Sequence, residues 1–143
     1  MRILGLDFGS KTVGVAVSDP TGLIASGVEI IRRDREDKLR KTYARIEELI
    51  LEYKVDFIVL GCPLNMDDSE GDRVRKTYAF KEALERRTGL KVELMDERLS
   101  TVEADELMNE AGIAGKDRKK YVDKIAATFI LQWYLDEHRA KGQ

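Results

Sequence analysis

The chain has 143 residues, of which 43% are hydrophobic and 36% charged, a composition typical of a soluble globular protein. Its formal net charge of −2 argues against a protein that coats nucleic acid by bulk positive charge, so any such contact must come from local basic patches. One cysteine and one histidine exclude an internal disulfide and an ordinary structural zinc site. No uncharged apolar stretch is long enough to span a membrane. We therefore expect a single cytoplasmic domain comprising residues 1–143.

The first nineteen residues predict a β-hairpin with an acid inside its first strand. The apolar run at residues 3–6 is typical of a buried strand, and a turn at residues 9–11 leads to a returning strand at residues 13–17. Asp7 continues the first strand, where a buried carboxylate needs a cation or several hydrogen-bond donors. The alternative is a turn aspartate that accepts hydrogen bonds from the backbone that follows it.

The next elements alternate between strand and helix. A DPTG turn at residues 19–22 precedes a third strand, expected from about Leu23 to Ile31, so three sequential antiparallel strands open the fold. Apolar residues from Leu39 to Tyr53 recur at helical spacing and predict an amphipathic helix. We interpret the charged run RRDREDKLRK, residues 32–41, as the entry and solvated face of that helix. The apolar run from Val55 to Gly61 predicts a central parallel strand covered on both faces.

The second half of the chain supplies one more strand and its flanking helices. A polar loop, CPLNMDDSEGD, precedes a helix expected from about Arg73 to Arg87 and ended by Gly89. The alternating run from Leu90 to Met95 predicts the fifth strand. The predicted fold class is therefore α/β, with three antiparallel strands followed by two strands in βα units.

Charged residues gather where the fifth strand ends. Asp96, Glu97 and Arg98 separate that strand from a helix whose start carries a capping box, Ser100 with Glu103. Ligand sites in open α/β sheets lie at the carboxyl ends of strands, which makes these acids candidate ligands. The alternative is that either acid merely favours the coming helix through the helix dipole.

The last helix carries an acid on its apolar side. Asp123 shares that side with a set of core positions at helical spacing: Ala126, Ala127, Ile130, Leu131 and Tyr134. An inward-facing acid needs a partner, which is either a metal or a lysine such as Lys120 or Lys124. Taken together, Asp7, Glu97 and Asp123 indicate a shared site more strongly than any one of them does.

Four separated blocks resemble the YqgF/RuvX family of Holliday-junction-resolvase-like proteins, which are assigned to pre-16S rRNA processing. These blocks are GLDFGSKTVGVAVSD, GCPLNMDDSEG, MDERLSTVEA and VDKIAATFILQWYLD, in the order and spacing of the family. The resemblance implies a ribonuclease-H-like fold with a mixed five-stranded sheet flanked by helices. It also implies a catalytic metal site, for Mg²⁺ or Mn²⁺, built from Asp7, Glu97 and Asp123. The chain departs from the family pattern at Thr12, which stands where an arginine is usual. The common DGS is Asp67, Asp68 and Ser69 here, and a frequent proline is Asp72, so the polar loop carries extra acids.

The implied activity is metal-dependent hydrolysis of phosphodiester bonds in structured RNA, at the 5′ end of pre-16S rRNA. Carboxylate oxygens suit Mg²⁺, and two such ions can activate water and stabilise the leaving oxygen. We expect phosphate contacts from basic residues near the acids, although each is equally consistent with a solvated surface charge: Lys11, Arg98, Lys116, Arg118, Lys119 and Lys120. The expected partners are nucleic acid and ribosomal precursor particles, without a membrane.

Two other functions remain open at this level. One is resolution of branched DNA, which usually requires a dimer, and the sequence is compatible with a monomer or a weak homodimer. The other is a non-catalytic nucleic-acid-binding module in ribosome assembly or transcription. An ATPase of the actin and sugar-kinase type is disfavoured, because such proteins use two domains of this size. GSKT at residues 9–12 also lacks the glycine that a P-loop has before its lysine.

Overall fold

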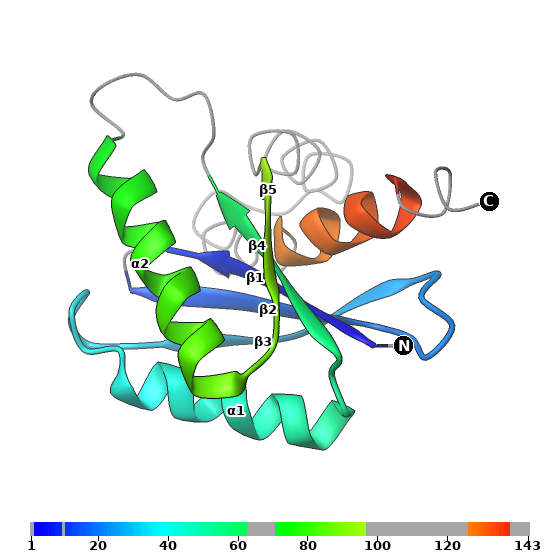
Figure 1. The fold of residues 1–143 in the computed structure, drawn as a ribbon, viewed down its shortest axis with the longest axis horizontal. Helices are drawn as coiled ribbons and strands as arrows, with labels where there is room; N and C mark the ends of the chain where they lie inside the picture. The colour runs from blue at the N-terminus through cyan, green and yellow to red at the C-terminus, as the bar shows by residue number, and fades with distance from the viewer. Residues whose placement is uncertain (1, 10, 63–70, 97–125, 138–143) are drawn as a thin grey trace, which may run out of the picture.

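The computed structural model describes residues 2–9, 11–62, 71–96 and 126–137, which form a twisted five-stranded sheet with helices on both faces (Figure 1). Its strands are β1 (Ile3–Phe8), β2 (Thr12–Ser18), β3 (Ala25–Arg32), β4 (Phe57–Cys62) and β5 (Val92–Asp96). The labelled helices are α1 (Arg40–Tyr53) and α2 (Gly71–Thr88), and residues 126–137 form a further helical segment. No helix among these residues is long and apolar enough to cross a membrane.

The strand order is β3-β2-β1-β4-β5, with β1 at the centre. β2 pairs antiparallel with β1 and β3, whereas β4 pairs parallel with β1 and β5. The carboxyl ends of the three parallel strands β1, β4 and β5 therefore meet at one edge of the sheet. This arrangement confirms the expected mixed sheet, with three sequential antiparallel strands followed by two parallel ones.

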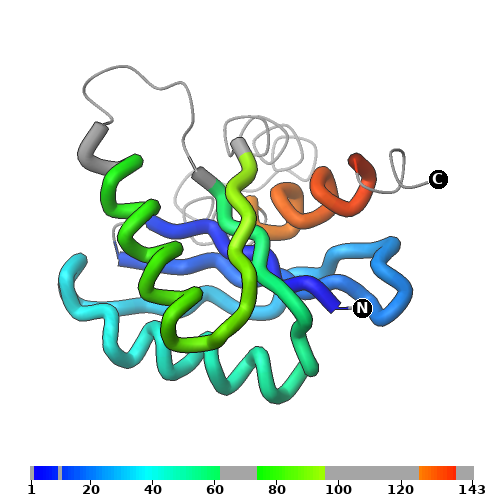
Figure 2. Tube along the Cα trace, in the orientation of Figure 1, coloured from blue at the N-terminus to red at the C-terminus, as the bar shows by residue number. Residues whose placement is uncertain are grey.

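The two faces of the sheet are covered by different helices. One core cluster joins Leu4, Leu6 and Phe8 of β1 to buried residues of α1 and α2. A second cluster joins Ile3 of β1 to the helical segment 126–137. Figure 2 shows α1 and α2 on one side of the sheet and the orange segment 126–137 on the other. Successive side chains of β1 therefore lie in different cores, because side chains alternate between the two faces of a strand.

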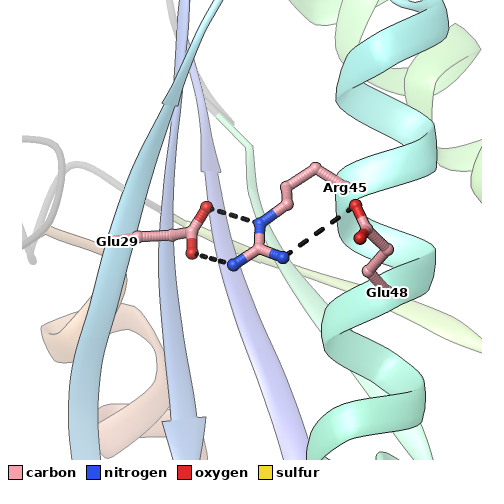
Figure 3. Close-up of polar contacts among 3 residues, drawn as sticks. All are labelled: Glu29, Arg45 and Glu48. Atoms are coloured by element: carbon pink, nitrogen blue, oxygen red, sulfur yellow. Dashed lines mark hydrogen bonds and ion pairs between the residues drawn. The ribbon is translucent and has the colours of Figure 1, made fainter.

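A side-chain bridge fixes α1 against the edge strand β3. Arg45 of α1 donates two hydrogen bonds to the Glu29 carboxylate of β3, from Nε at 2.9 Å and from Nη2 at 2.6 Å (Figure 3). Glu48 lies on the other side of the same guanidinium, with its carboxylate 3.9 Å from Nη1. The hydrogen bonds from Arg45 lower the pKa of Glu29. Such a two-pronged contact between planar groups also sets the orientation of the helix relative to the strand.

The third strand begins later than its apolar residues predict. The Asp19 carboxylate accepts hydrogen bonds from the backbone N–H groups of Leu23, at 2.8 Å, and Ile24, at 2.9 Å. These bonds hold both residues in the turn and lower the pKa of Asp19. Leu23 and Ile24 are consequently exposed, and β3 starts at Ala25.

Candidate functional site

Asp7 lies inside β1, not in the turn that follows it. It is hydrogen-bonded into the sheet between β2 and β4, and only 8% of its surface is exposed. The backbone of Asp7 therefore belongs to the strand and not to the turn. Its aligned neighbours are Gly14 on β2 and Gly61 on β4. Because aligned residues of neighbouring strands share a face of the sheet, the two positions beside the Asp7 carboxylate have no side chains.

Asp7 occupies the face of the sheet that the segment 126–137 covers. Ile3, Gly5 and Asp7 alternate along β1, and Ile3 belongs to the core cluster on that face. The segment packs directly on the backbone at Gly5. A Cβ at this position would lie 2.7 Å from Leu131 Cβ and 3.2 Å from the Ala127 carbonyl oxygen. Only glycine allows this close approach.

The direction of the segment follows from two contacts. Ala127 lies against Gly5, whereas Tyr134 makes an edge contact with Phe57, at a ring-centroid distance of 5.6 Å. Phe57 is aligned with Ile3, at the amino end of β1. The segment therefore runs antiparallel to β1, and its amino end points toward the end of the strand that carries Asp7.

The edge strand β5 reaches the same level of the sheet. Asp7 is aligned with Gly61, which is aligned with Met95, and Met95 packs against the cluster on the face of Asp7. β5 ends one residue later, at Asp96. Glu97 and Asp123 lie outside the described residues, as do the predicted phosphate contacts Arg98, Lys116, Arg118, Lys119 and Lys120. Within the described ranges, no three His, Cys, Asp or Glu side chains form a group able to hold a metal.

Lys11 is exposed on the turn that follows Asp7, and Arg33 anchors this turn. The backbone N–H of Gly9 donates to the Thr12 carbonyl oxygen at 2.7 Å, which closes the turn. Arg33 donates its backbone N–H to the Lys11 carbonyl at 2.9 Å and Nη2 to the Gly9 carbonyl at 2.7 Å. Its guanidinium lies 5.1 Å from the centroid of the Phe8 ring, and burial lowers the pKa of Arg33. Sequence analysis missed this role, because Arg33 stands in a charged run interpreted as solvated surface.

The chain matches the family described as "RuvX: Holliday junction resolvase" over residues 1–137. It belongs to this family. A relative from Agathobacter rectalis is 64% identical over 136 residues, covering 95% of each chain. Another, from Lachnospira eligens, is 56% identical and covers 95% of this chain and 97% of its own. Both bear the name "Putative pre-16S rRNA nuclease", so the family and the nuclease activity predicted from the sequence agree with these relatives.

Solved structures show the same fold at low sequence identity. Thermus thermophilus RuvC, in complex with a Holliday junction substrate, gives a TM-score of 0.60 at 13% identity over 96% of each chain. The fowlpox virus Holliday junction resolvase gives 0.53 at 17% identity over 99% of each chain. These similarities confirm the ribonuclease-H-like fold class.

Proposed function

We propose that this RuvX-family protein is a divalent-metal-dependent nuclease that hydrolyses phosphodiester bonds in structured RNA, at the 5′ end of pre-16S rRNA. The observation that carries the proposal is the position of Asp7, a buried carboxylate at the carboxyl end of the central strand with a glycine on either side. A buried carboxylate is costly unless a cation or hydrogen-bond donors satisfy it, and a bound metal would supply such a cation. The names of the relatives supply the substrate class.

Three acids are proposed to hold Mg²⁺ or Mn²⁺: Asp7, Glu97 and Asp123. Glu97 is two residues beyond Met95 in the sequence, so the alternation of a strand would assign it the face of Asp7. Asp123 precedes Ala127 by four residues in the sequence, so helical spacing would assign it the side of Ala127, which packs on β1. Carboxylate oxygens are the donors that these hard cations prefer, so the donor set fits the metal. When bound, the metal would polarise the scissile phosphate and lower the pKa of a coordinated water.

The residues around Asp7 would admit and position the substrate. Gly14 and Gly61 place no side chains beside the carboxylate, which would suit close approach of a phosphate group. Lys11 lies on the turn that follows β1 and would contact a phosphate of the bound strand without reading its bases. Arg33 would hold that turn in place through its two hydrogen bonds. Arg98 and the basic residues from Lys116 to Lys120 remain predicted phosphate contacts.

The test is cleavage of a labelled RNA that carries the pre-16S 5′ region, in Mg²⁺ or Mn²⁺, by the parent protein and Asp7→Asn. We expect Asp7→Asn to lose at least about a thousandfold in rate, as variants of catalytic residues commonly do. Asp56→Asn is a matched control, because Asp56 lies at the opposite end of the sheet, where its carboxylate accepts a hydrogen bond from the Arg2 backbone at 2.9 Å. A rate for Asp7→Asn equal to that of the parent would contradict the proposal, as would a parent that cleaves nothing with either metal.

Branched DNA is the second candidate substrate, favoured by the description of the family. A four-way DNA junction in the same assay separates the two, because the true substrate should be cut with the larger kcat/KM. Resolution of a junction requires paired cuts, so the mass of the protein–junction complex should then correspond to two copies of the chain. A protein that binds both nucleic acids but cuts neither would be a non-catalytic module.

A further inference from the structure

The connection between β3 and α1 carries a surplus of positive charge. Residues 32–41 contain six basic and three acidic side chains, in a chain whose net charge is −2. This segment borders a depression of about 450 Å³, and five of its eight lining residues are basic. Arg32, Lys38, Arg40 and Lys41 are exposed there. The charged run is therefore a concentrated basic surface as well as the entry to a helix.

The three acids of the segment offset only part of the charge of its six basic residues. Glu36 is paired with Lys76 of α2, whose Nζ lies 2.6 Å from its carboxylate, and this contact lowers the pKa of Glu36. Within the described part of the chain, no ion pair involves Lys38 or Lys41. Their charge is thus available to a ligand.

The stability of α1 does not account for these cations. Its first turn begins with Arg40 and Lys41, contains no acid and has no side-chain cap at Leu39. The helix dipole disfavours a cation at the amino end of a helix, typically by about 0.3–1 kcal/mol. Residues placed at a cost in stability are often kept for function.

Hydrogen bonds place this surface beside the turn that follows Asp7. Arg33 lies within the connection and binds the carbonyl oxygens of Gly9 and Lys11, on either side of the turn. Arg32 is aligned with Thr12, the first residue of β2. Figure 2 shows the β3–α1 connection (cyan) and the β1–β2 turn (blue) at the same end of the sheet. Lys11 therefore lies next to the basic surface, on the turn that follows the strand carrying Asp7.

We infer that Lys38 and Lys41, together with Lys11 and Arg32, bind the sugar–phosphate backbone of the nucleic acid that flanks the cleaved bond. This inference rests on the proposed function, because it assigns the substrate-binding surface of the same site. Exposed lysines and arginines contact phosphates without reading bases. Binding at this surface should therefore depend strongly on salt and little on sequence.

The test measures RNA binding in chelator, where no metal supports cleavage. The probe is a labelled RNA hairpin with a single-stranded 5′ extension, titrated at several salt concentrations with the full chain. Lys38→Gln/Lys41→Gln should reduce the slope of log K against log salt by about one to two units, equally for unrelated sequences. The matched control, Lys54→Gln/Lys91→Gln, removes two exposed lysines at the opposite end of the sheet and should leave the slope unchanged. Asp34→Asn, which removes an opposing charge, should tighten binding.

Thermal unfolding is measured for each variant and should give the midpoint of the parent, because the substituted side chains are exposed. Equal slopes for the test and control variants, or no binding of RNA by the parent, would overturn the inference. The parent could cleave RNA with metal while Lys38→Gln/Lys41→Gln keeps the salt slope of the parent. That combination would overturn the inference but not the proposed function. A selective loss of slope in a protein that never cleaves would support phosphate binding at this surface, but it would overturn the nuclease activity and with it the assignment to a cleaved bond.

Discussion

The central strand β1 presents two different surfaces to its two cores. Toward α1 and α2 it presents Leu4, Leu6 and Phe8, all large and buried. Toward the segment 126–137, Ile3 is followed by a glycine and then by Asp7. On this second face, apolar packing thus gives way to close backbone approach and then to a charge. One strand therefore serves stability on one side and the candidate site on the other.

The contrast is sharpest at the carboxyl end of β1. Phe8 packs against aromatic side chains. The Phe80 ring stacks on it at a centroid distance of 4.2 Å, and the Tyr43 ring stacks on Phe80 at 5.4 Å. On the other face, next to Phe8 in the sequence, the Asp7 carboxylate lies between two glycines. Substitutions at neighbouring positions of β1 should therefore separate stability from activity.

The largest expected difference is between Leu6→Ala and Asp7→Asn. Leu6 has no exposed surface, so its truncation should lower the free energy of unfolding by about 2–5 kcal/mol. Asp7→Asn should leave the metal-free protein as stable as the parent or slightly more stable, because it relieves repulsion among the proposed carboxylates. Urea unfolding in chelator measures both values.

In excess Mn²⁺ the parent should become more stable than Asp7→Asn. A metal that binds only the folded state adds about 2.7 kcal/mol to the free energy of unfolding when its free concentration is a hundred times its Kd. The variant should lose most of this added stability. If Asp7→Asn is as destabilised as Leu6→Ala in chelator, and metal does not stabilise the parent, then Asp7 is a structural acid and the contrast between the two faces fails.

The second prediction concerns the close approach at Gly5. In Gly5→Ala the new Cβ would lie 2.7 Å from Leu131 Cβ, so the segment 126–137 has to shift. Such overpacking typically costs about 1–3 kcal/mol, and we expect a similar loss in urea unfolding. Leu131→Gly removes the opposing Cβ, so the double variant should be more stable than the sum of the two single effects predicts. Strict additivity would show that the cost of Gly5→Ala does not arise from the contact with Leu131.

Much of this contrast could be predicted from the sequence. Apolar runs separated by turn residues correctly predicted all five strands, and helical spacing predicted α1 and the buried side of the segment 126–137. An acid in an apolar strand singled out Asp7. These features depend on residues close together in the sequence, which is the range over which periodicity is informative.

The remainder depends on contacts between distant residues. The glycines beside Asp7 come from β2 and β4, and only the strand register shows that they are its neighbours. The anchoring role of Arg33 likewise depends on how β3 ends beside the first turn. Because side-chain hydrogen bonds override apolar propensity, Asp19 also delays the start of β3. Glu97 and Asp123 remain predictions, since they lie outside the described residues.

The third prediction tests the attachment of the segment 126–137 to the edge strand β5. The Tyr134 hydroxyl is hydrogen-bonded to Glu93, and burial together with this carboxylate raises the pKa of Tyr134 above its ordinary value of 10.0. Tyr134→Phe should lower the free energy of unfolding by about 1 kcal/mol at neutral pH. Above pH 10, the unfolded state loses the tyrosine proton first, so the advantage of the parent should shrink as the pH rises. Urea unfolding from neutral to alkaline pH measures this difference, and a gap that stays constant would contradict the assignment.

The smallest expected effect is on the other face, at the bridge between Glu29 and Arg45. Arg45 lowers the pKa of Glu29 below its ordinary value of 4.5, so the folded state binds this proton less readily than the unfolded state. The resulting stabilisation is complete above the unfolded pKa and is lost as the pH falls through the folded one. Glu29→Gln should therefore be less stable than the parent at pH 7, and the two unfolding curves should converge in acid. The effect should be smaller than that of Tyr134→Phe, because solvent and salt screen a partly exposed pair.

The matched control is Glu48→Gln. Glu48 is 67% exposed, and its carboxylate lies 3.9 Å from the same guanidinium, too far for a hydrogen bond. This substitution should therefore change the free energy of unfolding little. Parallel curves for Glu29→Gln and the parent would show that the bridge orients α1 without stabilising it, whereas convergence would assign acid sensitivity to the α1 face and alkaline sensitivity to the face of Asp7.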